Sequence, residues 1–179
     1  MPHIAALEAQ GVGRVMSMKI IIFLAIAMAV AAFVRAQILR QPIVFYSATM
    51  GDVETLFQQL KKTGENASYV TFAFESSEAM EGSHIELQFS IENDAIGFDW
   101  VLLGPEKARD LPKFKEIARS LGHYIQEKEG NGVKYLRVED GDLVGLCTTV
   151  AKLMYKANDS TIVDVIAKNF EVRGYKLLQ

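Results

Sequence analysis

Cysteine and histidine are scarce in this sequence, and their scarcity argues against several kinds of site. The chain has one cysteine, Cys147, so it cannot form an internal disulfide framework. The three histidines do not stand at spacings typical of zinc sites. No base lies near Cys147 in the sequence, so we interpret this residue as a small buried hydrophobic side chain and not as a nucleophile. We expect no catalytic residue, no metal and no cofactor.

Basic residues are absent over a long stretch of the chain. There is no lysine or arginine between Lys62 and Lys107, whereas basic residues are frequent directly after Lys107. The formal net charge is -3. A mildly acidic chain is poorly suited to the phosphate backbone of nucleic acids or to an anionic lipid surface. We therefore expect no nucleic-acid partner, and contact with a membrane only through the N-terminal segment.

The stretch without basic residues is rich in carboxylates, which suggests a binding surface. Its most acidic part is the loop ESSEAMEGS at residues 75–83. One interpretation is an acidic patch that recruits a basic protein partner. The other is an ordinary solvated surface whose two signs of charge partly neutralise each other. The candidate partner-binding residues are Glu75, Glu78, Met80, Glu81, Glu86 and Asp99.

One long hydrophobic run stands near the N-terminus. Residues 20–34 are fifteen consecutive apolar residues, with Lys19 before them and Arg35 after them. As a helix this run would span about 22 Å, which is short for a bilayer core of about 30 Å. It has the length of the apolar region of a secretory signal, with a cleavage position before Gln37. A retained membrane anchor and a fully buried core helix are the alternatives.

The hydrophobic run divides the chain into two expected parts. We predict that residues 1–36 are a signal peptide or signal anchor, and that the true start is Met16 or Met18. Residues 37–179 are then a single exported domain. Cleavage after Ala36 predicts a periplasmic or extracellular protein. Retention predicts a single-pass anchor with the C-terminus outside.

The pattern after residue 42 predicts a β-α-β-β unit. Residues 42–48 are a short apolar run typical of a strand, and residues 51–64 have helical spacing with Asp52 as the cap. Alternating apolar residues then predict strands over residues 68–76 and 84–91. The ENDA segment that follows favours a tight hairpin turn.

The next part of the chain predicts the same order of elements again. Residues 96–103 alternate as a strand, and residues 110–122 predict a helix capped by Asp110 with Pro112 in its first turn. Residues 123–139 predict a hairpin around Gly-Asn-Gly. The two halves share no residue-level identity. Either a duplication or a coincidence explains the repeated order of elements.

Two helices and an edge strand are expected at the C-terminus. DLVGLCTTVAKLMYKAN and STIVDVIAKNF both show apolar positions at helical spacing, and EVRGYKLL favours a last edge strand. The sequence therefore predicts an α+β fold of ferredoxin-like type. Its antiparallel sheet would carry helices on one side, in two β-α-β-β units followed by two helices.

Three classes of function agree with these patterns. The first is a non-catalytic binding or inhibitory module, exported or tethered to a membrane, that uses its acidic face. The second is a small hydrolase of the cell envelope that works through carboxylates such as Asp99 or those at residues 139–142. The third is a structural envelope protein.

Overall fold

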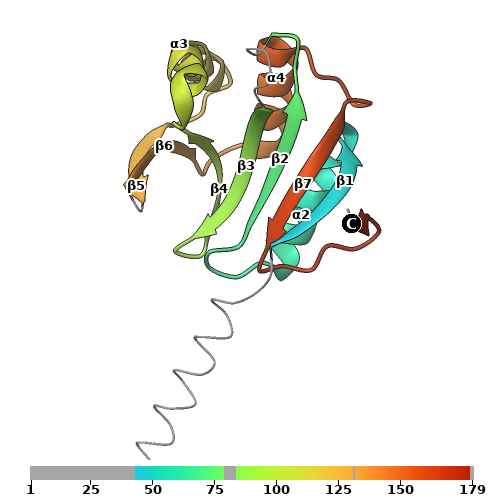
Figure 1. Ribbon diagram of the computed structural model, residues 1–179. Coiled ribbons are helices and arrows are strands. Elements are labelled where there is room, and N and C mark those ends of the chain that lie inside the picture. The colour runs from blue at the N-terminus through green and yellow to red at the C-terminus, as the bar shows by residue number, and fades with distance from the viewer. Residues whose placement is uncertain (1–42, 79–83, 131, 178–179) are drawn as a thin grey trace, which may run out of the picture. The chain divides into compact units, whose positions relative to one another are not determined.

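The computed structural model describes residues 43–78, 84–130 and 132–177. In this part of the chain, eight strands form one antiparallel sheet that is accompanied by three α-helices (Figure 1). The strands are β1 (Val44–Thr49), β2 (Tyr69–Glu75), β3 (His84–Glu92), β4 (Ala95–Val101), β5 (Gln126–Gly130), β6 (Val133–Val138), β7 (Ile162–Lys168) and β8 (Lys176–Leu177). The helices are α2 (Val53–Thr63), α3 (Gly104–Ser120) and α4 (Leu143–Tyr155), and a 3-10 turn, η1 (Met50–Asp52), precedes α2. The strand order is β5-β6-β4-β3-β2-β7-β1-β8, which confirms the α+β class and the antiparallel sheet.

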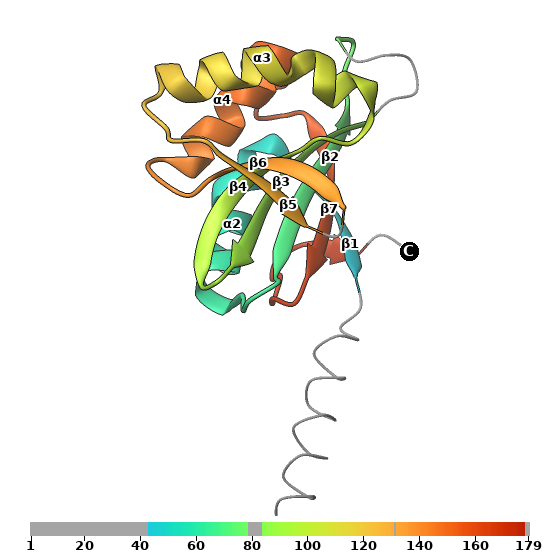
Figure 2. The ribbon, with the colours of Figure 1, turned by 90° about the vertical axis from the view of Figure 1, so that its left-hand side faces the viewer.

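All three α-helices pack on one face of the sheet (Figures 1 and 2). In α2, Phe57 meets Phe89 of β3 with ring centroids 4.9 Å apart. In α3, Phe114 stacks on Trp100 of β4 at 4.6 Å, and Tyr155 of α4 lies over the same Trp100 at 6.5 Å. Burial of these large side chains supplies the main driving force for the fold. We call this the inner face, and the opposite one the outer face.

Two split β-α-β arrangements recur in the sheet. Strands β1 and β2 both run antiparallel to β7, which lies between them, so β1 and β2 are parallel and α2 connects them. Strands β4 and β5 both run antiparallel to β6, so they too are parallel, and α3 connects them. The predicted order β-α-β-β therefore occurs twice between β1 and β6.

A tight hairpin joins β3 to β4, as the sequence predicted. Glu92 pairs with Ala95, and the two residues between them, Asn93 and Asp94, have φ values of 51° and 64°. Positive φ at both central residues is typical of a type I′ turn, which matches the twist of the flanking strands. The turn fixes the register of the hairpin, and with it which residues face each neighbouring strand.

The prediction for α3 was wrong about its start. The helix begins at Gly104, six residues before Asp110, so Pro112 lies inside it and not in its first turn. Gly104 has a φ of 79°, which only glycine adopts without strain, and Pro105 then fixes a helical φ in the first turn. The Gly-Pro pair therefore turns the chain away from β4 and begins the helix.

The second C-terminal helix was also wrongly predicted, because residues 162–168 form the strand β7. This strand lies inside the sheet, between β2 and β1. Val163, Val165 and Ala167 face inward and are buried, whereas the outer positions Ile162 and Ile166 are also apolar. Apolar residues on both faces of a central strand hide the alternation of period two and imitate helical spacing.

No helix in the described residues is both long enough and apolar enough to cross a membrane. The apolar run at residues 20–34 lies outside the described residues, as do the predicted signal or anchor and both candidate start sites. The N-terminal expectations therefore stay predictions.

Candidate functional site

Strands β3 and β4 separate before they end, and the separation creates an opening in the sheet. Their pairing stops at Gln88 and Asp99. Beyond that point β4 continues only with β6, where Val101 pairs with Tyr135. Leu87 and Trp100 stand where the next pair would form, followed by Glu86 and Val101, and Figure 1 shows the two strands diverging at this end. We call this opening the β3–β4 split.

A cavity of about 350 Å³ occupies the β3–β4 split. Its volume lies at the lower end of the range found for small-ligand sites. Strand β3, the end of β4, the first turn of α3 and the end of α4 all contribute to its wall. The lining residues are His84, Ile85, Glu86, Val101, Leu103, Gly104, Pro105, Glu106, Lys107 and Tyr155.

Lys107 is the buried charged group of this cavity. Its side chain comes from the first turn of α3, and the residue is only 8 % exposed. The Nζ atom donates a hydrogen bond of 2.7 Å to the backbone carbonyl of Glu86 and lies 4.0 Å from the centre of the Trp100 ring. The ammonium thus satisfies a strand carbonyl that β4 leaves unpaired and gains a cation–π contact.

Burial lowers the pKa of Lys107 to about 8, from an ordinary value of 10.5. Desolvation is the largest cause, because it disfavours the charged form of the amine. The carboxylates of Glu86, Asp110 and Glu106 act in the opposite direction. At neutral pH the amine is still mostly protonated, and it titrates about one unit above neutrality.

The stability of the protein is expected to rise with pH as Lys107 loses its proton. Between pH 8 and 10.5 the unfolded chain holds this proton more tightly than the folded chain, so rising pH favours the folded state. From pH 7.5 to pH 9.5 the free energy of unfolding should increase by about 2 kcal/mol. Urea denaturation at several pH values, followed by tryptophan fluorescence, measures this change.

Lys107→Met is the matched control for this titration. Methionine keeps a long apolar stem beside Trp100 but has no proton to release. The variant should therefore lack the rise in stability between pH 7.5 and pH 9.5. A wild-type stability that is flat or falls over this interval would contradict the burial of the amine.

Two of the carboxylates predicted for partner binding lie on the outer face beside the split. On that face Ala73 of β2 pairs with Glu86 on one side and with Asp164 of β7 on the other. Glu75 lies two residues further along β2, opposite His84. The three carboxylates are exposed, and no described residue forms an ion pair with them. We call Glu75, Glu86 and Asp164 the acidic cluster.

The other candidate residues of the acidic loop have different surroundings. Glu78 is exposed and forms an ion pair of 2.5 Å with Lys156, which lowers the pKa of the Glu78 carboxyl. Its charge is thus partly neutralised in the folded chain. Met80 and Glu81 lie outside the described residues, so their part in a binding surface stays a prediction.

Asp99 is on the outer face but is not available to a partner, because it is buried. Its side chain is 2 % exposed and lies 2.7 Å from a guanidinium nitrogen of Arg137, whose side chain is fully buried. Ser90 also donates a hydrogen bond of 2.5 Å to the Asp99 carboxylate. Burial raises the pKa of Asp99, against the opposing charge of Arg137. We therefore leave Asp99 out of the candidate binding surface.

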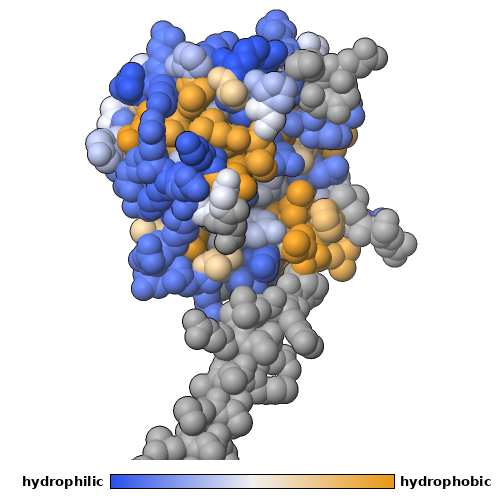
Figure 3. All heavy atoms as spheres, turned by 60° about the vertical axis from the view of Figure 1, so that its left-hand side comes forward, coloured by the Kyte–Doolittle hydropathy of each residue, from blue (hydrophilic) through white to orange (hydrophobic). Residues whose placement is uncertain are grey.

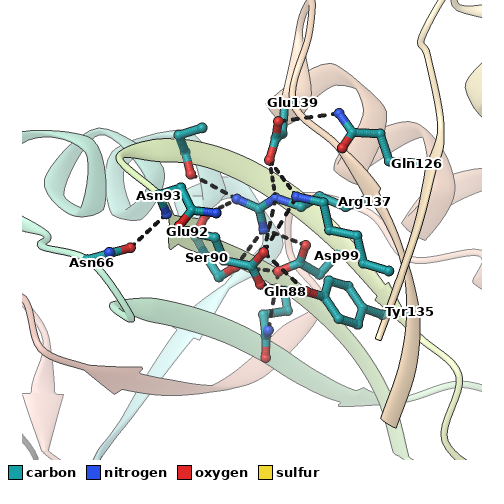
Figure 4. A network of polar contacts seen from close by, with 12 residues as sticks. Asn66, Gln88, Ser90, Glu92, Asn93, Asp99, Gln126, Tyr135, Arg137 and Glu139 are labelled. Atoms are coloured by element: carbon teal, nitrogen blue, oxygen red, sulfur yellow. Dashed lines mark hydrogen bonds and ion pairs between the residues drawn. The ribbon is translucent and has the colours of Figure 1, made fainter. Parts of the chain in front are cut away.

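Arg137 is the centre of a polar network on the outer face (Figure 4). Besides Asp99, its guanidinium contacts the Glu139 carboxylate at 2.5 Å and the backbone carbonyl of Ala95 at 2.8 Å. Glu92 lies 3.8 Å away and accepts a hydrogen bond from Tyr135. This network connects β3, β4 and β6 just below the β3–β4 split, so it holds together the strands that diverge there.

The carboxylates at residues 139–142 have structural partners. Glu139 binds Arg137 and Lys128, and these contacts lower its pKa. The Asp142 side chain accepts a hydrogen bond from the backbone of Gly145 and caps α4, as the sequence predicted. Asp140 accepts a hydrogen bond from the backbone N–H of Tyr124. The prediction that Cys147 is buried is confirmed, and burial raises the pKa of its thiol.

The outer face also carries apolar residues beside Asp164 of the acidic cluster, since Phe45 and Ile166 stand two positions along β1 and β7 from the pair Ser47 and Asp164. Ile43 and Phe45 are about half exposed, and Phe45 pairs with Ile166 on β7. Hydrophobic side chains form a patch at the lower right of the surface seen in Figure 3. Nothing in the described residues indicates what covers them.

Three residues that shape the candidate site could not be predicted from the sequence. Lys107 is the first residue of a basic segment, and its sequence neighbours give no sign of burial. Asp164 lies in a segment whose spacing predicts a helix but which forms the strand β7. Arg137 alternates with apolar residues, as an exposed strand residue does. The only available signal was Gly97, a glycine within a strand, which often marks the close approach of another group.

Among the described residues, no group of three or more histidine, cysteine, aspartate or glutamate side chains is placed to hold a metal ion. No protein-family model matches the chain, and neither a curated protein nor a solved structure is significantly similar to it.

Proposed function

We propose that this protein is a non-catalytic binding module that recognises a basic protein partner at the β3–β4 split. The observation that carries the proposal is the juxtaposition of a cavity with exposed carboxylates. Glu86 belongs both to the cavity wall and to the acidic cluster, and Glu75 stands opposite His84 at the cavity edge. A cationic side chain on the outer face beside Glu75, Glu86 and Asp164 meets an attractive field, whereas an anionic one is repelled there.

The arrangement of charges favours binding over catalysis. A hydrolase that uses carboxylates needs one with a raised pKa in a cleft. Asp99 has the raised pKa, but Arg137 neutralises it, and it does not line the cavity of the β3–β4 split. The carboxylates at residues 139–142 hold strands and a helix in place. The hydrolase and the structural envelope protein stay alternatives without an observation in their favour.

We propose further that the binding module acts outside the cytoplasm. The apolar run at residues 20–34 has the length of a signal sequence and is preceded by a basic residue. The domain that follows would be released if the run is removed, or tethered if it is kept. The two split β-α-β arrangements support our assignment of the fold to the ferredoxin-like type.

Neutralising the acidic cluster is expected to weaken binding of a basic ligand at least tenfold. The variant is Glu75→Gln/Glu86→Gln/Asp164→Asn, which keeps the size of each side chain and removes the charge. The probe is a short synthetic peptide of alternating lysine and valine. Its binding is measured through the fluorescence of Trp100, the single tryptophan of the chain, or by calorimetry.

Glu65→Gln is the matched control. Glu65 is exposed and precedes β2, so it lies beyond the end of this strand opposite to Glu75. This variant should bind the peptide as the wild type does. Equal losses in both variants, or no loss in the triple variant, would contradict the proposed site.

A further inference from the structure

We propose that the basic partner enters the β3–β4 split as an extended segment that adds a strand to the free edge of β3. This inference rests on the proposed function and specifies the form of the partner. Lysine or arginine side chains of the segment would face the acidic cluster. The intervening apolar side chains would enter the cavity. Main-chain hydrogen bonds supply affinity in this mode of recognition, and pockets for alternate side chains supply specificity.

The register of the hairpin shows which backbone groups of β3 are free to accept a strand. In a two-residue hairpin, Glu92 and Ala95 form a hydrogen-bonded pair, and every second residue of β3 then points its backbone groups toward β4. The odd-numbered residues point toward β2, as the hydrogen bond from Ile91 N to the Ser68 carbonyl confirms. Glu86 and His84 therefore direct their N–H and carbonyl groups into the split.

Lys107 supports this assignment of the free edge. Its Nζ donates to the Glu86 carbonyl from the β4 side, where the N–H group of an added strand would donate. The amine therefore lies where one N–H group of the added strand would lie. A carbonyl oxygen accepts two hydrogen bonds. The incoming N–H therefore either shares the Glu86 carbonyl with the Lys107 amine or displaces that amine.

The residues around the split fit a segment in which basic and apolar side chains alternate. In an antiparallel pair, the residue opposite Glu86 has its side chain on the same face of the sheet as Glu86. That face carries Glu75 and Asp164, and favours a cation. The neighbouring residues of the segment point to the other face, where Leu103, Pro105 and Tyr155 line the cavity. The split therefore suits a basic–apolar alternation and disfavours an acidic one.

Backbone methylation of the probe peptide tests strand addition directly. In the bound geometry the N–H groups of the lysine residues point toward β3, and those of the valine residues point away. N-methylation of the central lysine residues should weaken binding at least tenfold, whereas N-methylation of the valine residues should change it less than threefold. A glutamate–valine peptide should not bind. Affinities are measured by calorimetry with the full-length protein.

The possible results separate this inference from the proposed function. If both methylated peptides bind as the parent peptide does, the partner is basic but does not form a strand, and only the inference fails. If the lysine peptide binds no better than the glutamate peptide, both proposals fail. A dimer of the free protein that dissociates as the lysine peptide binds would place a second copy at the edge and overturn the inference. Loss of binding in Glu86→Lys, with unchanged binding in Glu65→Lys, supports the site.

Discussion

Replacement of Arg137 by methionine is expected to lower the free energy of unfolding by about 4 kcal/mol. The guanidinium is fully buried and neutralises Asp99, which is itself 2 % exposed. Its loss leaves a buried carboxylate without a counter-charge, and it removes the hydrogen bonds to Ser90 and to the Ala95 carbonyl. Removal of one partner of a buried pair is far more costly than the net value of the pair. Urea denaturation at neutral pH measures the loss.

A double variant distinguishes the orphaned charge from a loss of packing. Arg137→Met/Asp99→Leu removes both members of the buried pair, so no unpaired carboxylate remains at this position. It should recover more than half of the stability that Arg137→Met loses. A loss below about 1 kcal/mol in the single variant would contradict the burial of the pair, because exposed pairs contribute that little.

Replacement of Gly97 by valine is the second change with a large expected effect. A Cβ atom at this position would lie 2.5 Å from the Cζ atom of Arg137. Valine otherwise favours a strand over glycine by up to about 1 kcal/mol. Because the guanidinium is fixed by its partners and cannot move aside, the clash should dominate. The free energy of unfolding should fall by about 3 kcal/mol, at the upper end for overpacked sites.

The same substitution in an Arg137→Ala background tests the cause. The three atoms nearest to an added Cβ all belong to Arg137, so without the guanidinium Gly97→Val should be neutral or stabilising. A double-mutant cycle gives the coupling between the two positions. If Gly97→Val costs the same in both backgrounds, the close approach of Arg137 to the strand is not the reason for the glycine.

Local patterns predicted most of the secondary structure where one face of an element is solvated. The alternation in β3 is clear because Ile85, Leu87 and Phe89 face the helices, while Glu86 and Gln88 face outward. The hairpin at Asn93 and Asp94 was also predictable, since these residue types tolerate positive φ. The order of elements up to β6 follows from such patterns alone.

Prediction failed where tertiary structure decides the outcome. The strand β7 has apolar residues at the outer positions Ile162 and Ile166 as well as at its buried inner positions, and its place between β1 and β2 joins segments far apart in the chain. The pattern at residues 162–168 cannot reveal these neighbours. The start of α3 was missed because a Gly-Pro pair is typical of a turn as well as of a helix start.

The candidate site was only partly predictable for the same reason. Charge segregation in the sequence indicated Glu75 and Glu86, and both lie on the exposed outer face. It also indicated Asp99. The alternation of residues in β4 places Asp99 on the outer face, but its burial depends on Arg137, which is far away in the sequence. The β3–β4 split itself arises where β4 keeps its pairing with β6 but loses its pairing with β3. No local pattern encodes this divergence.

The salt dependence of peptide binding measures whether exposed, unpaired carboxylates at the β3–β4 split attract a basic segment. Such attraction is screened by salt. The affinity of wild-type protein for the lysine–valine peptide should therefore fall at least tenfold between low and high sodium chloride concentrations. For Glu75→Gln/Glu86→Gln/Asp164→Asn it should change less than threefold. An affinity that is independent of salt, or equally dependent on salt in the two proteins, would contradict the account.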